Sequence, residues 1–277
     1  MLAALLALGA SLAWGAGDFT GGVKSRVLPV LTVLAVSQPF GLVVLGIAVA
    51  VRGTPPDGWD VCWACLAALL GTLGLVAFYR GMAAGAMSVV APIAAVAAGI
   101  PVAWGVASGD RLSFLQAIGI AAALGGSVIA SLERHAEGTR VAAGAGWAVL
   151  AMLCFGGYFV PMHAAAPHDW LWPSFVFRCT SVPLVWAALL VRRTPPAGIR
   201  PHLPALVAIG ILDTGGNTLF AGAAAAHGLL SLAAALGSLY PVVTILLARL
   251  FLGERVQRSQ DLGVVVALAG VVLITAG

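Results

Sequence analysis

Charged residues are scarce in this chain. Asp, Glu, Lys and Arg make up 9% of its 277 residues, whereas 61% are hydrophobic and the mean hydropathy is +1.05. A water-soluble domain carries about 25% charged residues to cover its surface. The deficit excludes a soluble globular protein and predicts that most of the surface faces lipid. We therefore expect an integral membrane protein whose main partner is the lipid bilayer.

Motifs that would mark a soluble or catalytic function are missing as well. The net charge is +4, but the basic residues are scattered at the ends of apolar runs as interfacial anchors, so no nucleic-acid binding is expected. No Walker-type Gly-x-x-x-x-Gly-Lys-[Ser/Thr], Gly-x-Ser-x-Gly, His-Glu-x-x-His or metal-ligand cluster occurs. Cys62 and Cys65 have redox spacing, but they open an apolar run without a βαβ context. The sequence thus predicts no enzyme activity, no cofactor and no metal site.

Long apolar runs fill most of the chain. A spanning helix needs about 20 predominantly apolar residues, and the runs are too long and too continuously apolar for barrel strands. No connection is long enough to hold a soluble domain, so the function is expected to lie within the bilayer. The sequence predicts an all-α protein with ten transmembrane helices, at 2–20, 29–51, 61–80, 87–107, 113–131, 145–162, 171–191, 203–222, 229–251 and 260–277.

The chain repeats itself after about 140 residues. Residues 51–58 (VRGTPPDG) return as 191–198 (VRRTPPAG), and Gly109-Asp110-Arg111 returns as Gly253-Glu254-Arg255. This divides the protein into two five-helix repeats, residues 1–131 and 145–277. Because five is odd, the second repeat enters the membrane from the opposite side, and both termini lie on the same side. Inverted repeats of this kind place a solute site between the halves and permit alternating access.

Several motifs resemble the EamA-like family of the drug/metabolite transporter (DMT) superfamily. The second half carries Ser238-Leu239-Tyr240-Pro241-Val242-Val243-Thr244, then Leu252-Gly253-Glu254-Arg255, Gln260 and Gly263; the first half carries a weaker counterpart from Ala91-Pro92 to Gly119. Trp14-Gly15 and Phe155-Gly156 fit the start of each repeat, and Phe177-Arg178 fits its second helix. The resemblance implies a ten-helix permease of a bacterial plasma (inner) membrane that moves small organic solutes, often as an efflux system.

The orientation in the membrane stays open at this point. Basic residues would place both termini outside by the positive-inside tendency, because only Arg52 and Arg111 lie on the side of the termini. The resemblance implies cytoplasmic termini instead. The basic residues of the opposite side are Lys24, Arg26, Arg134, Arg140, Arg192, Arg193, Arg200, Arg255 and Arg258.

The first half departs from the family pattern at two places. It has Ser37-Gln38-Pro39 where the second repeat has Arg178, and no Tyr-Pro pair corresponds to Tyr240-Pro241. Equal roles for the two halves are therefore not expected.

Charged residues inside the spans are the strongest indication of a site. A charge at the centre of the bilayer costs about 2.5–3.5 kcal/mol on insertion scales. Arg178 and Asp213 either form a buried structural pair between neighbouring helices or line a cavity as solute or proton groups. Asn217 lies one turn after Asp213 and shares its face. A lone carboxylate at Asp213 would suit a coupled proton.

Asp18 follows a glycine cluster one turn after Trp14, and a thinned helix there would expose backbone groups to a cavity. The alternative is that Asp18 lies near the interface and pairs with Lys24. The predicted cavity residues are Trp14, Asp18, Arg178, Asp213, Asn217 and Tyr240. Pro92 and Pro241 lie within spans and are predicted to kink helices that bend between open states.

These features favour a secondary transporter for a small organic metabolite, with a proton as a candidate coupling ion. One alternative is a channel or a non-transporting membrane scaffold, although no charged ring or filter-like loop is present. A remote alternative is an intramembrane aspartyl protease, because Gly15-Ala16-Gly17-Asp18 matches Gly-x-Gly-Asp and Asp213 would supply the second carboxylate. The solute, the direction, the coupling ion and the oligomeric state are not encoded in any motif.

Overall fold

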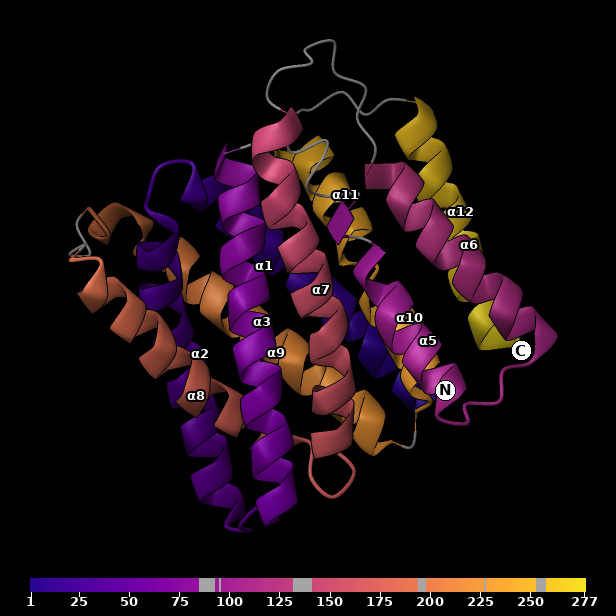
Figure 1. The fold of residues 1–277 in the computed structure, drawn as a ribbon, viewed down its shortest axis with the longest axis horizontal. Helices are drawn as coiled ribbons and strands as arrows, with labels where there is room; N and C mark the ends of the chain where they lie inside the picture. The colour runs from indigo at the N-terminus through magenta and orange to yellow at the C-terminus, as the bar shows by residue number, and fades with distance from the viewer. Residues whose placement is uncertain (85–92, 95, 132–140, 194–197, 227, 253–257) are drawn as a thin grey trace.

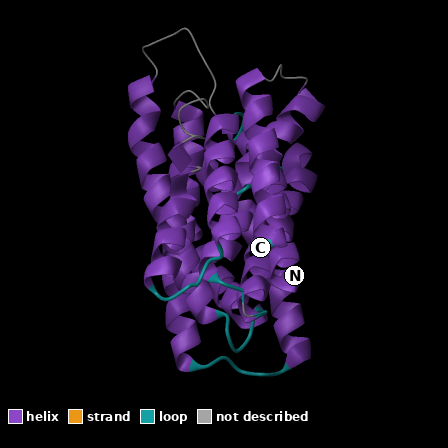
Figure 2. Ribbon diagram, turned by 90° about the vertical axis from the view of Figure 1, so that its right-hand side faces the viewer, coloured by secondary structure: helices purple, strands orange, loops and turns teal. Residues whose placement is uncertain are grey.

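The computed structural model describes residues 1–84, 93–94, 96–131, 141–193, 198–226, 228–252 and 258–277, and all regular structure among them is helical. The helices lie side by side in one elongated bundle, with the two termini close together (Figures 1 and 2). Eight described segments are long and apolar enough to cross a membrane, and two shorter apolar ones accompany them. The first half contains α1 (Leu2–Ser25), α2 (Val30–Arg52), α3 (Gly58–Ala84), the short η1 (Val96–Ala98), α5 (Gly99–Ala107) and α6 (Phe114–Ser131). The second half contains α7 (Val141–Ala165), α8 (Leu171–Val191), the short η2 (Arg200–His202), α9 (Leu203–Ala225), α10 (Leu230–Gly237), α11 (Tyr240–Leu252) and α12 (Arg258–Ala276).

The two halves interlock instead of forming separate units. α1 packs along α9 of the other half, and α7 packs along α3 in the same way. Equivalent helices also pack on each other, α2 on α8 and α6 on α12, and the contact of α2 with α9 is mirrored by that of α8 with α3. This pattern is unchanged when the halves are exchanged, as a pseudo-two-fold arrangement of two inverted repeats requires.

The α6–α12 pair shows the symmetry at single residues, because these two helices lie side by side at one edge of the bundle (Figure 1). A Cβ on Gly126 would overlap the backbone of Ala267, and a Cβ on Gly270 would overlap the backbone of Ala123. Gly119 approaches Gly270 in turn, so the helices run antiparallel. In lipid, helices associate through close backbone approach, which these small residues permit. The glycines therefore hold the two repeats together along this edge.

The predicted span 229–251 coincides with a described segment that is long and apolar enough to cross a membrane, Leu230–Phe251, but its helix is interrupted. The segment 229–251 is not a single helix, because α10 ends at Gly237 and α11 begins at Tyr240, with a turn at Ser238–Leu239 between them. Pro241 has no N–H to continue the ladder, and it sits in the first turn of α11, where a helix start tolerates it. For the predicted span 87–107, the structure describes η1 and α5, whereas residues 85–92 and 95 lie outside the described part.

Candidate functional site: a cavity between the two repeats

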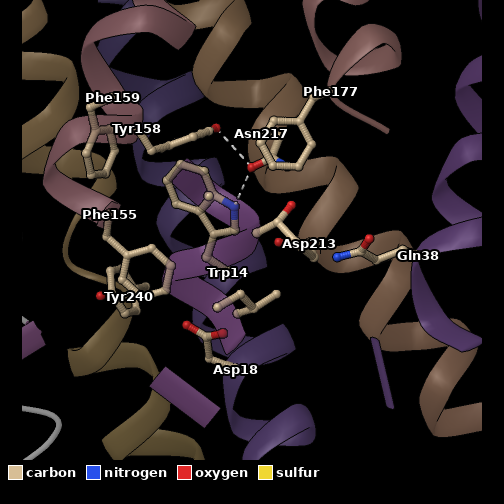
Figure 3. Close-up of a pocket in the computed structure, with 13 residues that line it drawn as sticks. Trp14, Asp18, Gln38, Phe155, Tyr158, Phe159, Phe177, Asp213, Asn217 and Tyr240 are labelled. Carbon is tan, nitrogen blue, oxygen red and sulfur yellow. Dashed lines mark hydrogen bonds between the residues drawn. The ribbon is translucent and has the colours of Figure 1, made fainter. Parts of the chain in front are cut away.

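A cavity lies at the centre of the bundle, where α1, α2, α3, α7, α8, α9 and α11 meet (Figure 3). It holds about 540 Å³ of empty space, counting the part that is open to the outside. Its walls come from both repeats, and its lining residues are Trp14, Asp18, Gln38, Gly71, Thr72, Leu75, Phe155, Tyr158, Phe159, Phe177, Asp213, Asn217 and Tyr240.

Asn217 fixes two aromatic side chains of the cavity from α9. Its Oδ1 accepts a hydrogen bond from Trp14 Nε1 at 3.1 Å and another from the Tyr158 hydroxyl at 2.9 Å (Figure 3). Asn217 is only 4% exposed, so these bonds are shielded from water and hold both rings in place. One amide thus connects α1 of the first repeat to α7 and α9 of the second.

Aromatic rings form most of the wall. Trp14 makes edge-to-face contacts with Tyr158 and Phe159, with ring centroids 6.1 and 5.9 Å apart. Phe155 in turn packs edge-to-face on Tyr240, with ring centroids 6.4 Å apart. Such arrangements bring the positive edge of one ring against the negative face of another. The cavity surface is therefore mostly apolar, with rings in fixed orientations.

Two glycines make room for the aromatic residues that begin each repeat. A Cβ on Gly216 of α9 would overlap the Trp14 ring, and a Cβ on Gly74 of α3 would lie 2.7 Å from Phe155 Cδ1. Trp14 and Phe155 therefore occupy equivalent places in the two repeats, each packed against a glycine of the partner repeat. The backbone is symmetric here, whereas the two side chains differ.

Arg178 and Asp213 form an ion pair between α8 and α9. Arg178 Nη2 donates to Asp213 Oδ2 at 2.6 Å, and the Arg178 side chain is fully buried while the Asp213 side chain is 22% exposed. Arg178 does not line the cavity, whereas Asp213 does. The guanidinium thus lies behind the carboxylate and neutralises it, as the structural interpretation of the sequence predicts.

Asp18 reaches the same cavity from α1. The Tyr79 hydroxyl of α3 donates to Asp18 Oδ1 at the long distance of 3.5 Å. Gly21, one turn further along α1, makes room for the Tyr79 ring, because a Cβ there would overlap the hydroxyl. Among the described residues no ion pair joins Asp18 to Lys24, and Asp18 contacts Tyr79 at the cavity instead.

Four other lining residues carry a buried polar atom without a hydrogen-bond partner among the described atoms. These atoms are Gln38 Oε1, Thr72 Oγ1, Asn217 Nδ2 and Tyr240 OH. A buried polar group left unpaired costs free energy, and such groups in a folded protein call for water or a ligand. These atoms are available to water or to a solute in the cavity.

The structure brings five of the six predicted cavity residues together at one cavity: Trp14, Asp18, Asp213, Asn217 and Tyr240. The sixth, Arg178, lies behind the wall, in contact with Asp213. Of the two predicted kink positions, Pro241 lies at the start of α11 after the helix break, and Pro92 lies outside the described residues. Within the described part of the chain, no group of three or more His, Cys, Asp or Glu side chains is arranged to hold a metal ion.

Sequence reasoning missed the aromatic half of the lining and Gln38. The duplication itself could have found three of these residues. Phe155 is the equivalent of Trp14, Phe159 is the equivalent of Asp18, and Gln38 is the equivalent of Arg178. Applying the repeat offset to each predicted site residue would have placed these positions at the cavity.

The comparisons with known proteins agree with this architecture. The sequence profile of the EamA-like transporter family matches residues 1–132 and again 142–276. The chain belongs to the EamA-like transporter family. This family is part of the DMT superfamily and typically comprises transporters without enzyme activity, so the protein is a multi-pass integral membrane transporter.

The same fold is known from a crystal structure. It matches with a TM-score of 0.79 and 18% sequence identity, over 99% of this chain and 98% of that one. Among curated proteins, none matches the chain in sequence.

Proposed function

We propose that this EamA-like protein is a secondary transporter that carries a small organic solute through the central cavity. The observation that carries this proposal is the cavity itself, which lies midway along the helices and is lined by both repeats. A site between inverted repeats can be exposed to one side and then the other by rocking one repeat against its partner.

Contacts between the repeats at one end of the bundle support a gated pathway. Asp110, from the connection between α5 and α6, accepts hydrogen bonds from the backbone N–H of Ser231 at 2.9 Å and from its hydroxyl at 2.6 Å. Asp110 thereby caps the start of α10 in the other repeat. At the same end, Arg52 Nη1 binds Asp169 Oδ1 across the repeats at 2.9 Å. Opening the cavity at this end would require such contacts to separate.

The energy source would be a gradient. The sequence has no nucleotide-binding motif and no segment long enough for a soluble ATPase domain. Asp18 lines the cavity without an ion-pair partner among the described residues and would be the group that responds to a coupled proton, whereas Asp213 is paired with Arg178.

Two alternatives find less support. A channel would have a continuous path lined by a filter or a charged ring, whereas polar contacts join the two repeats at one end of this bundle. A protease of the two-aspartate type needs both carboxylates to share a proton. Asp213 is instead engaged by Arg178.

Solute flux into proteoliposomes tests the proposal, with amines, amino acids, nucleosides and sugars as solutes, with and without a proton gradient. Asn217→Ala removes the acceptor for Trp14 and Tyr158, and two hydrogen bonds of about 1 kcal/mol each predict a tenfold or larger loss of flux. Thr218→Ala is the matched control, because that hydroxyl bonds to Thr214 O of its own helix at 2.8 Å. Non-saturating flux would indicate a channel, and no flux from folded protein would indicate a scaffold.

A further inference from the structure

The charges that face the cavity do not balance. Among the described lining residues, the charged side chains are Asp18 and Asp213, and no lysine or arginine is among them. Arg178 lies behind Asp213, fully buried, at 2.6 Å from its Oδ2. The guanidinium therefore compensates one carboxylate and leaves the other to the cavity.

Asp18 is the carboxylate without a cation. The described ion pairs do not include it, and its one printed hydrogen bond comes from the neutral Tyr79 hydroxyl at 3.5 Å. A carboxylate within a membrane span is unfavourable unless a positive charge or several hydrogen bonds compensate it. Asp18 thus requires a positive partner from the cavity whenever it is ionised.

The rest of the cavity suits a cation that also has an apolar body. Trp14 lies one turn from Asp18 on α1. The Phe155 and Tyr240 rings lie beside Trp14 in the close-up (Figure 3). The faces of such rings attract organic cations. Gln38 Oε1 and the Tyr240 hydroxyl are buried, unpartnered and able to accept hydrogen bonds, which an ammonium group donates.

We infer that the solute is an organic monocation, an amine with a flat apolar body, whose ammonium group binds at Asp18 while its ring packs against Trp14 and the neighbouring aromatic side chains. This inference rests on the proposed function, because it takes the cavity as the solute site. A zwitterion such as an amino acid is disfavoured, since its carboxylate would need a cation in the lining and Arg178 is held behind Asp213.

Equilibrium binding to the purified full-length protein in detergent tests the inference, measured by titration calorimetry. Four probes share one ring and differ in charge: phenethylamine is a cation, 2-phenylethanol is neutral, 3-phenylpropionate is an anion and phenylalanine is a zwitterion. We expect phenethylamine to bind at least tenfold more tightly than each of the other three. Equal affinities, or tighter binding of phenylalanine or phenylpropionate, would overturn the inference.

Two variants locate the charge. Asp18→Asn should reduce phenethylamine affinity to the level of phenylethanol, whereas Asp261→Asn should leave it unchanged. Asp261 is the matched control because it pairs with Arg249 at the surface, away from the cavity. Unchanged phenethylamine binding by Asp18→Asn would contradict the role of this carboxylate. If Asp18→Asn does not fold, the ranking of the four probes on the unsubstituted protein still decides the matter.

Binding and flux separate this inference from the proposed function. A protein that binds phenethylamine with the expected preference but moves no solute keeps the inference about the site and loses the transport proposal. A protein that moves neutral or anionic solutes with saturation, and does not prefer the amine, keeps the transport proposal and loses the inference.

Discussion

Asp213→Asn should destabilise the protein more than removal of its partner Arg178. The substitution leaves the guanidinium fully buried, with Nε and Nη1 also lacking partners among the described atoms. Breaking a buried ion pair by removing one partner costs about 3–5 kcal/mol. Because 1 kcal/mol shifts the melting temperature of a chain of this size class by about 2–4 °C, the expected loss is on the order of 10 °C.

Arg178→Met should cost less, because it removes the charge and leaves Asp213, which is 22% exposed and open to water in the cavity. A cost of roughly 1–2 kcal/mol is expected for this carboxylate, since partial solvation replaces the lost partner. The double variant Arg178→Met/Asp213→Asn should recover most of the stability that Asp213→Asn loses, because no uncompensated charge remains. The three variants form a double-mutant cycle that isolates the pair.

Thermal unfolding in detergent, followed by loss of the monodisperse peak in size-exclusion chromatography, measures all of these variants. The Arg249–Asp261 pair provides the control. The Arg249 Nη1 and Asp261 Oδ1 atoms are 2.9 Å apart, but the two side chains are 56% and 50% exposed. Exposed pairs contribute at most about 1 kcal/mol, so Asp261→Asn should shift melting by only a few degrees. Equal losses for Asp213→Asn and Arg178→Met that add in the double variant would refute the reasoning.

Three further substitutions test the contacts between helices. Gly126→Ala should lower the free energy of unfolding by about 1–3 kcal/mol, because the added Cβ overpacks α6 on α12. Gly125→Ala is the control and should not lower it, because a Cβ there meets no atom within 4 Å. Equal melting temperatures of the two variants would contradict the close approach of the helices. Asp110→Ala should lower stability by about 0.5–2 kcal/mol through loss of the α10 cap, and unchanged melting would argue against the cap. Pro241→Ala should change stability by less than about 1 kcal/mol, because a proline in the first turn of a helix gives up no intrahelical bond. A large loss of stability would show that the proline ring maintains the break between α10 and α11. Lower flux at unchanged stability would show that Pro241 acts in gating.

The architecture could be predicted from the sequence because lipid imposes simple rules. Apolar runs must form helices, since no water is present to satisfy the backbone, and the repeated segments 51–58 and 191–198 reveal the duplication. The break between α10 and α11 could not be predicted in the same way. Hydropathy depends on the side chains alone, and it does not reveal a turn at Ser238–Leu239, because the residues on both sides are equally apolar.

The polar residues of the site could be predicted because polar side chains are rare within the apolar spans. Asp18, Asp213 and Asn217 stand out in apolar spans because burying them is costly, and all three line the cavity. The aromatic lining could not be found by the same criterion. Tyr158 and Phe177 are ordinary residues for an apolar helix, and only the tertiary packing shows that they face a cavity and not lipid.

The two repeats share a backbone arrangement but not a chemistry, and this difference has a mechanistic consequence. The contacts of Gly126 and Gly270 are equivalent on the two sides of the α6–α12 pair, so a rocking motion meets the same packing in both directions. The cavity is asymmetric, because Asp18 corresponds to Phe159, and Arg178 corresponds to Gln38. Symmetric packing can give two conformations of similar free energy, whereas an asymmetric cavity holds a solute in one orientation. Substitutions at the paired glycines should therefore change the stability and the rate of exchange, and substitutions at Asp18 should change which solute is accepted.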